Sequence, residues 1–294
     1  MKLFRCKEFW LSGGILRTLL GISLFFSFCT VQAAPKESLR IHFINVGQAD
    51  CILIQAPQGK NMLVDAGNNE DAPFITDYLA KQGVTKLRAV VGTHPHEDHI
   101  GSLGNIIRQF SVEKVYLPKV TANTKTFENV LLAVKAKKLK INTARAGVEV
   151  PLHPAVKAQF LAPNQDKYEE LNNYSAVLKI TYGKNSFLLT GDAEDVSEKE
   201  MLQKQYKLKA DLLKVGHHGS LSSTTETFLA AVAPQYAVIS VGRGNKYKHP
   251  SRKTLSLLKK YHVKVFRTDK AGTIIVTSNG KSLTFASDKS KDIR

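Results

Sequence analysis

The sequence predicts one α/β domain whose two halves each run from β-strands into helices. Short runs of strand-forming residues alternate with helical periodicity along most of the chain. No stretch rich in Pro, Gly or Ser divides the 294 residues, and an apolar fraction of 43% is enough to form a sizeable core. Polar side chains of metal-ligating type also follow four of the predicted strands.

The first half begins with three β-rich runs separated by tight turns, which predict an antiparallel meander. These runs cover 39–46, 51–55 and 61–65. The apolar run Leu87–Val91 predicts a buried strand. The remaining elements of this half are helices over 72–82, 103–110 and 126–138 and a strand over 114–117.

The second half is expected to begin with a hairpin over 148–162, around His153. Further strands are predicted over 175–182, 186–190, 211–215, 236–241, 263–266, 273–277 and 282–285, and helices over 196–206, 225–232 and 251–261. The domain therefore spans residues 39–286, and a polar tail, 287–294, is expected to fray.

Residues 1–33 are typical of a secretory signal peptide. A basic start precedes the apolar run 19–31, and small residues allow cleavage near Ala33 or Ala34. A membrane anchor is disfavoured because Arg17 interrupts a run that is already shorter than the ~20 residues a span needs. We therefore expect an exported protein, periplasmic or secreted, with no membrane span after cleavage.

Cleavage changes what the cysteines and the charge imply. Only Cys51 would remain, in an apolar setting that suits a buried side chain, so no intramolecular disulfide is expected. The net charge is +17, and residues 1–33 carry +3 of it from four basic groups and one acid, which leaves +14. This surplus favours an anionic polymer as partner, although a general contribution to solubility stays open.

Three histidines and one aspartate lie within six residues: His94, His96, Asp98 and His99. Packing explains this density poorly, because each buried imidazole would need its own partner. Imidazole and carboxylate are instead ligands of borderline divalent metals such as zinc. The spacing puts His94 and His96 on one side of an extended loop and directs Asp98 and His99 to a second position, which suits two ions.

Three more residues of this type follow predicted strands: Asp65, Asp192 and His217. Strand ends hold ligands rigidly, so we predict that these side chains converge with the histidine cluster. Asp192 is expected to bridge two ions that lie ~3.5–4 Å apart.

These motifs resemble the metallo-β-lactamase superfamily. The segment 93–101 is similar to its signature loop, and 45–50, 63–67, 191–192, 214–220 and 245–250 resemble the extracytoplasmic hydrolase domain of ComEC-type competence proteins. The resemblance covers about residues 39–286. It implies a four-layer αββα sandwich with the site at one edge of two packed sheets. Because no hydrophobic span follows the signal, a free-standing, exported relative is expected.

The resemblance also implies a cofactor of two divalent ions, zinc or alternatively manganese. The implied ligands are His94 and His96 for the first ion, Asp98, His99 and His217 for the second, and Asp192 as the bridge. Asp65 would orient a loop histidine.

The first ion has an incomplete ligand set. Many superfamily members supply a third histidine between the loop and the bridging aspartate, whereas here only His153 lies in that interval. The local counterpart is expected to be Asn172-Asn173, and an amide oxygen is a weaker ligand than imidazole. The first site would therefore bind loosely, prefer a harder ion such as manganese, or fill only with substrate present.

Residues near the second ion are expected to face substrate or a hydrogen-bond partner, namely His218 and Ser220. His249 has two interpretations: contact with a substrate phosphate or leaving group, or a helix N-terminal residue before Ser251. The basic residues of 243–253 suit a phosphate-rich substrate or a solvated face.

Metal-assisted hydrolysis is the expected reaction, with Asp98, Asp192 and His249 as catalytic residues. Charge and the resemblance together favour a phosphodiester in DNA or RNA. Two alternatives stay open. One is a hydrolase of phosphocholine esters, lactams or other small esters. The other is a metal-containing module that holds nucleic acid without cleaving it.

Overall fold

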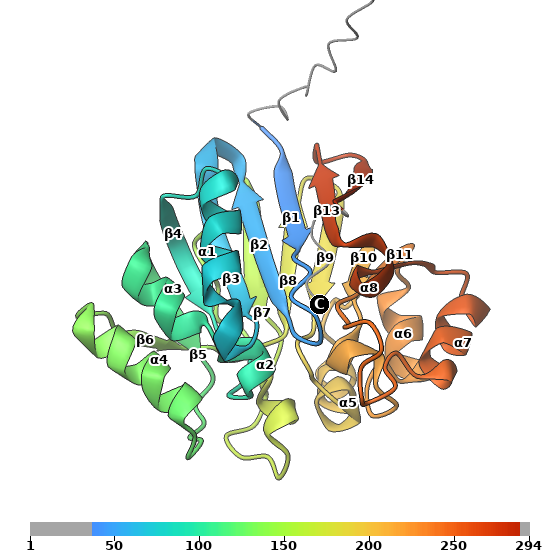
Figure 1. The fold of residues 1–294 in the computed structure, drawn as a ribbon. Coiled ribbons are helices and arrows are strands. Elements are labelled where there is room, and N and C mark those ends of the chain that lie inside the picture. The colour runs from blue at the N-terminus through green and yellow to red at the C-terminus, as the bar shows by residue number, and fades with distance from the viewer. Residues whose placement is uncertain (1–36, 289–294) are drawn as a thin grey trace, which may run out of the picture. The chain divides into compact units, whose positions relative to one another are not determined.

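Two β-sheets form the centre of the part that the computed structural model describes, residues 37–288 (Figure 1). The predicted signal peptide lies outside this range. The first sheet has eight strands in the order β14-β13-β1-β2-β3-β4-β5-β6. Their bounds are β1 (Leu39–Phe43), β2 (Cys51–Ala56), β3 (Lys60–Ala66), β4 (Lys86–Val91), β5 (Ser111–Leu117), β6 (Ile141–Thr143), β13 (Thr273–Ser278) and β14 (Leu283–Asp288).

The second sheet has six strands in the order β12-β11-β10-β9-β8-β7. Its strands are β7 (Val156–Phe160), β8 (Leu178–Tyr182), β9 (Asn185–Leu189), β10 (Leu212–Lys214), β11 (Tyr236–Ile239) and β12 (Lys264–Arg267). The predicted meander is confirmed, because β1–β2 and β2–β3 pair antiparallel. The strands that lead to the site are parallel: β3–β4–β5 in one sheet and β9–β10–β11 in the other.

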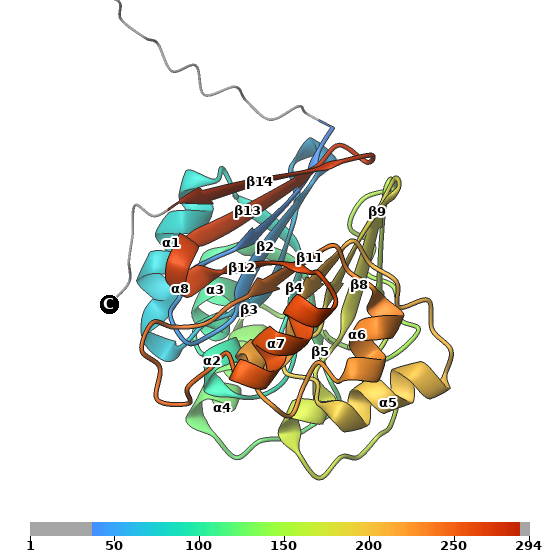
Figure 2. The same cartoon turned by 90° about the vertical axis from the view of Figure 1, so that its right-hand side faces the viewer.

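Helices cover the outer face of each sheet, and the inner faces pack against each other (Figure 2). The helices on the first sheet are α1 (Ala72–Lys81), α2 (Glu97–Ile100), α3 (Leu103–Gln109) and α4 (Lys125–Ala136). Those on the second are α5 (Asp195–Gln203), α6 (Glu226–Val232) and α7 (Arg252–Lys260), and a short α8 (Thr268–Ala271) follows β12. The predicted four-layer αββα sandwich is therefore confirmed.

Alternation along β1 shows how the sequence builds these layers. Leu39, Ile41 and Phe43 are buried between the sheets. His42 points to the opposite face, where its Nδ1 lies 2.7 Å from the hydroxyl of Tyr78 on α1. The period of two thus gives one strand an apolar inner face and a polar contact to the helix layer.

Three details differ from the sequence-based prediction. The three-residue β6 and the short helices α2 and α8 were not predicted. Only one arm of the hairpin around His153 is a strand, and the other contributes two isolated bridges. β14 extends to Asp288, so the first two residues of the predicted tail pair with β13, and residues after 288 lie outside the described range. Within residues 37–288 no helix combines the length and the apolar character needed to cross a membrane.

Burial of His42 makes the stability of the fold depend on pH. Burial, with a smaller effect of Arg40, lowers the pKa of His42 to about 3, whereas an unfolded histidine titrates near 6.5. Below about pH 6.5 only the unfolded chain takes up this proton, so the free energy of unfolding falls as pH falls towards 3.

We expect His42 to account for roughly 2–3 kcal/mol of the loss in unfolding free energy between pH 7.5 and 4.5. The measurement is urea unfolding of the wild type and of His42→Gln, which keeps a polar partner for Tyr78, at both pH values. Losses of equal size in the two proteins would contradict the assignment.

Candidate metal centre

The loop after β4 is held by the end of β3. Asp65 Oδ1 accepts a hydrogen bond from Thr93 N, and its Oδ2 accepts one from Thr93 Oγ1, both at 2.8 Å. The loop then forms α2. Directly after this helix, a Cβ on Gly101 would collide with the backbone of Asn68 and Asn69. Only glycine allows this close approach. The two strands therefore fix the loop at the edge of the sheet where both end.

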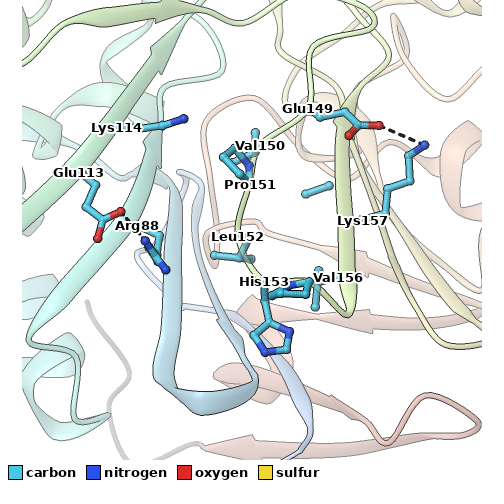
Figure 3. Close-up of a pocket in the computed structure, with 12 residues that line it drawn as sticks. Arg88, Glu113, Lys114, Glu149, Val150, Pro151, Leu152, His153, Val156 and Lys157 are labelled. Atoms are coloured by element: carbon cyan, nitrogen blue, oxygen red, sulfur yellow. Dashed lines mark hydrogen bonds and ion pairs between the residues drawn. The ribbon is translucent and has the colours of Figure 1, made fainter.

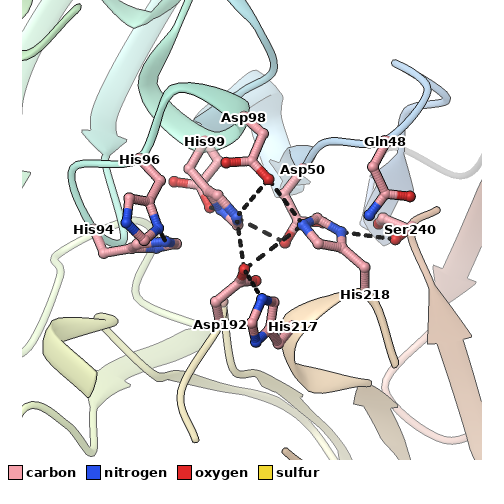
Figure 4. A network of polar contacts seen from close by, with 12 residues as sticks. Gln48, Asp50, His94, His96, Asp98, His99, Asp192, His217, His218 and Ser240 are labelled. Atoms are coloured by element: carbon pink, nitrogen blue, oxygen red, sulfur yellow. Dashed lines mark hydrogen bonds and ion pairs between the residues drawn. The ribbon is translucent and has the colours of Figure 1, made fainter. Parts of the chain in front are cut away.

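Four side chains from both sheets converge at this edge (Figure 4). Asp98, His99, Asp192 and His218 each offer one ligand atom, and these atoms lie within 4.8 Å of one another. His99 Nε2 is 3.3 Å from Asp192 Oδ2. His218 Nε2 is 3.2 Å from Asp98 Oδ2 and 3.7 Å from Asp192 Oδ2. Asp192 therefore lies between two imidazoles that come from different sheets.

The polar atoms of this cluster fit a bound cation. His99 Nε2 and Asp192 Oδ1 are buried and have no hydrogen-bond partner among the described residues. Buried groups of this kind are almost always satisfied, so a missing partner points to an ion or water. Two imidazole nitrogens and two carboxylates are a donor set that suits zinc or manganese.

Charge within the cluster shifts the pKa of its members. Burial lowers the pKa of His99, but the carboxylates of Asp192, Asp98 and Asp65 outweigh burial and hold it well above its usual value. Burial alone would raise the pKa of Asp192, yet His99 and His218 bring it well below normal. The two shifts have one electrostatic cause: the carboxylates of the cluster favour positive charge at its centre, as a cation site requires.

His94 and His96 lie beside this cluster. Their rings contact each other, with His94 Nε2 2.9 Å from His96 Nδ1, and the His94 ring centroid is 4.1 Å from that of His99. The Ser175 hydroxyl lies 3.3 Å from His94 Nδ1 and accepts a hydrogen bond from Asp192 N. The pair is therefore close enough to the cluster to form a second, adjacent binding position.

Comparison with known proteins agrees with this geometry. Residues 44–243 match the model of the metallo-beta-lactamase superfamily. The chain belongs to this superfamily.

Similar proteins carry names that refer to competence and recombination. One is "Competence protein ComA" of Neisseria gonorrhoeae, which is 28% identical and covers 83% of this chain and 33% of that protein. The chain is 31% identical over 297 residues to "ComE operon protein 3" of Bacillus subtilis, which covers 95% of this chain and 37% of that protein. It is 29% identical to "Recombination protein 2" of Haemophilus influenzae, and the match covers 89% of this chain and 32% of that protein. The chain thus spans about a third of the length of these curated relatives. These similarities support the competence-type branch of the superfamily.

Solved structures share the fold at low sequence identity. "CmlA beta-hydroxylase E377D mutant" gives a TM-score of 0.53 at 13% identity and covers 80% of this chain and 52% of that chain. "Igni18, a novel metallo hydrolase" from Ignicoccus hospitalis gives a TM-score of 0.51 at 15% identity and covers 81% of this chain and 98% of that chain. At such identities the likeness supports the fold alone.

The structure places both His217 and His218 near Asp192. We expected His217 to complete the second ion and His218 to point elsewhere. In the structure His218 joins the cluster, while His217 Nε2 lies 3.7 Å from Asp192 Oδ2 and its Nδ1 faces Glu194 at 3.2 Å. Both histidines have left-handed backbone, with φ of 46° and 50°. This conformation, rare for non-glycine residues, directs the two rings and cannot be deduced from spacing.

We expected Asn172-Asn173 to take the place of the missing third histidine. In the structure Asn172 Oδ1 is buried without a hydrogen-bond partner among the described residues, whereas Asn173 Oδ1 is hydrogen-bonded. Asn173 Oδ1 accepts hydrogen bonds from Glu194 N and Ser197 N, so it caps the start of α5. The neighbouring Asn172 lies beside His217, with Nδ2 3.5 Å from Nδ1.

His153 lies in a different place, a surface hollow of about 870 Å³ (Figure 3). The hollow is lined by Arg88 and Glu113, which lie near the starts of β4 and β5, and by residues 149–158. Because the cluster follows the other ends of these strands, His153 is not one of its ligands.

Asp50 and Lys214 are buried polar residues that were not predicted to belong to the site. Lys214 is fully buried, and its ammonium lies 2.7 Å from Asp50 Oδ2. Asp50 Oδ1 is 3.6 Å from Nδ1 of His218, which also lies 2.9 Å from Ser240 O. The ion pair therefore lies on the Nδ1 side of His218 and helps to position this histidine in the cluster. A lysine within the apolar run 211–215 was the signal that could have revealed it.

The remaining predicted residues lie close to the cluster. Asp65 Oδ2 is 2.8 Å from His99 Nδ1, the contact expected of a carboxylate that orients a loop histidine. The Ser220 hydroxyl contacts that of Ser222, which lies 3.1 Å from His217 Nδ1. The His249 ring lies 5.7 Å from that of His217, and burial lowers its pKa. Ser251, rather than His249, caps α7.

Proposed function

We propose that this protein is an exported, metal-dependent phosphodiesterase that cleaves nucleic acid. The observation that carries the proposal is the cluster of Asp98, His99, Asp192 and His218, with unpartnered buried ligand atoms and with His94 and His96 beside it. A two-ion site of this kind is a recurrent solution for phosphodiester hydrolysis.

Ions bound here would supply Lewis acidity, which activates water and stabilises the negative charge that develops on the phosphate. The side chains of the protein orient this chemistry. Asp65 holds the Nδ1 side of His99 and the Ser240 carbonyl holds that of His218, so both Nε2 atoms face Asp192. His249 lies against His217, where it can donate a hydrogen bond to a phosphate oxygen or a proton to the leaving oxygen.

Charge and kinship support a nucleic acid as the substrate. After removal of residues 1–33 the net charge is 17 − 3 = +14, and residues 243–253 beside the cluster contain five basic and no acidic side chains. The names of the relatives, which refer to competence and recombination, are consistent with a nucleic acid. Export rests on the signal-like segment 1–33.

A comparison of three chromogenic substrates tests the proposed class. We expect the full chain loaded with zinc or manganese to hydrolyse bis-p-nitrophenyl phosphate, and the chelator-treated chain and the His94→Ala, Asp192→Ala double variant to be inactive. Faster turnover of nitrocefin or p-nitrophenylphosphorylcholine would instead favour a small-molecule hydrolase. Salt-dependent DNA binding without any turnover would favour a binding module.

A further inference from the structure

Tyr247 is an exposed aromatic side chain on the loop between β11 and α7. Its exposed fraction is 57%, although large aromatic side chains are usually well buried. Residues 243–253 around it contribute five basic side chains, and the Lys246 ammonium lies 5.1 Å from the ring centroid. The ring is thus presented to solvent in a positively charged setting.

The loop that carries Tyr247 is constrained by hydrogen bonds. Asn245 Nδ2 donates to the carbonyls of Gly242 and His249, at 2.9 and 2.7 Å, and Asn245 Oδ1 accepts from His249 N. Gly242 N donates to Gln48 Oε1 on the turn between β1 and β2. The backbone on both sides of Tyr247 is therefore constrained before any ligand arrives, which lowers the entropic cost of binding.

A series of rings connects Tyr247 with the metal centre. Tyr247 stacks on His249, with centroids 5.8 Å apart and planes at 17°. His249 in turn lies against His217, whose Nε2 is 3.7 Å from Asp192 Oδ2. A phosphate at the cluster would therefore place a neighbouring nucleotide within reach of the exposed tyrosine.

We propose that Tyr247 stacks on an unpaired base next to the phosphate that is cleaved, and so makes the site selective for single-stranded nucleic acid. The inference rests on the proposed function and names a residue that sets its specificity. Every base offers a flat face to an aromatic ring, while the surrounding cations hold the backbone. In a duplex each base is already stacked and paired, so the same contact requires that a base be extruded.

Binding measurements separate stacking from charge. All proteins carry Asp192→Asn so that the ligand stays intact, and fluorescence anisotropy reports their affinity for a labelled single-stranded oligonucleotide, its abasic counterpart and a duplex. We expect Tyr247→Ala to weaken single-strand binding at least about fivefold, the lower end for one stacked base. Tyr247→Phe, which keeps the ring, and Leu132→Ala, a control 49% exposed on α4, are expected to stay within about twofold.

The outcomes distinguish this inference from the proposed function. Unchanged single-strand affinity in Tyr247→Ala would overturn base stacking. So would a loss of affinity for the abasic and duplex ligands as large as the loss for the single strand. Hydrolysis of bis-p-nitrophenyl phosphate by the protein with Asp192 intact, compared with and without metal, tests the metal chemistry separately. If hydrolysis fails while the Tyr247 effect holds, the proposed reaction is wrong but base recognition stands.

Discussion

Replacement of Asp192 by asparagine is expected to lower the rate of phosphodiester hydrolysis at least about a thousandfold, equivalent to about 4 kcal/mol of transition-state stabilisation. Its carboxylate lies between His99 and His218, with Oδ2 3.3 and 3.7 Å from their Nε2 atoms. Asparagine removes the negative charge and one of the two oxygens that can bind a cation. The measurement is kcat with bis-p-nitrophenyl phosphate, together with the metal content of both proteins.

Asp195→Asn is the matched control, because it makes the same chemical change three residues along the chain. Asp195 is exposed at the start of α5, and this variant is expected to keep activity within about twofold. An Asp192→Asn protein that keeps more than about a tenth of the wild-type rate would show that this carboxylate is not at the reacting centre.

Replacement of Lys214 by methionine is expected to lower the free energy of unfolding by roughly 3–5 kcal/mol. The ammonium is fully buried and lies 2.7 Å from Asp50 Oδ2, so its loss deprives a buried carboxylate of its nearest cation. Urea unfolding of the metal-free protein measures the effect. The double variant Lys214→Met, Asp50→Leu should be less destabilised than the sum of the single changes, since it removes both charges.

Lys157→Met provides the control for Lys214→Met. Lys157 also pairs with a carboxylate, Glu149, but both side chains are about 60% exposed, so water screens the pair. We expect a change of no more than about 1 kcal/mol for this variant. A Lys214→Met effect of the same size, or strict additivity in the double variant, would mean that the buried pair contributes little.

The arrangement of strands was predictable because the sequence carries it locally. Apart from Arg88, the side chains of Leu87–Val91 are apolar and buried, as a parallel strand covered on two sides requires, and the strand delivers the histidine loop as expected. The three-residue β6 could not be predicted. It forms by pairing with β5, and two of its three side chains are exposed, so no periodic pattern marks it.

The site was predictable as a set of residue types but not as a set of contacts. The spacing of the loop and the polar residues at strand ends indicated which side chains would converge. The choice between His217 and His218 depends on a left-handed turn, which local sequence does not reveal. The contact of Asp50 with Lys214 joins the two sheets, so only the folded structure brings these residues together.

The most direct measurement is cleavage of a labelled single-stranded oligonucleotide by the full chain, first stripped of metal and then reloaded with zinc or manganese alone. We predict shortened products only after reloading, and none from the Asp192→Asn protein under the same conditions. Equal products with and without metal, or none with either metal, would contradict a metal-dependent nuclease centred on Asp98, His99, Asp192 and His218.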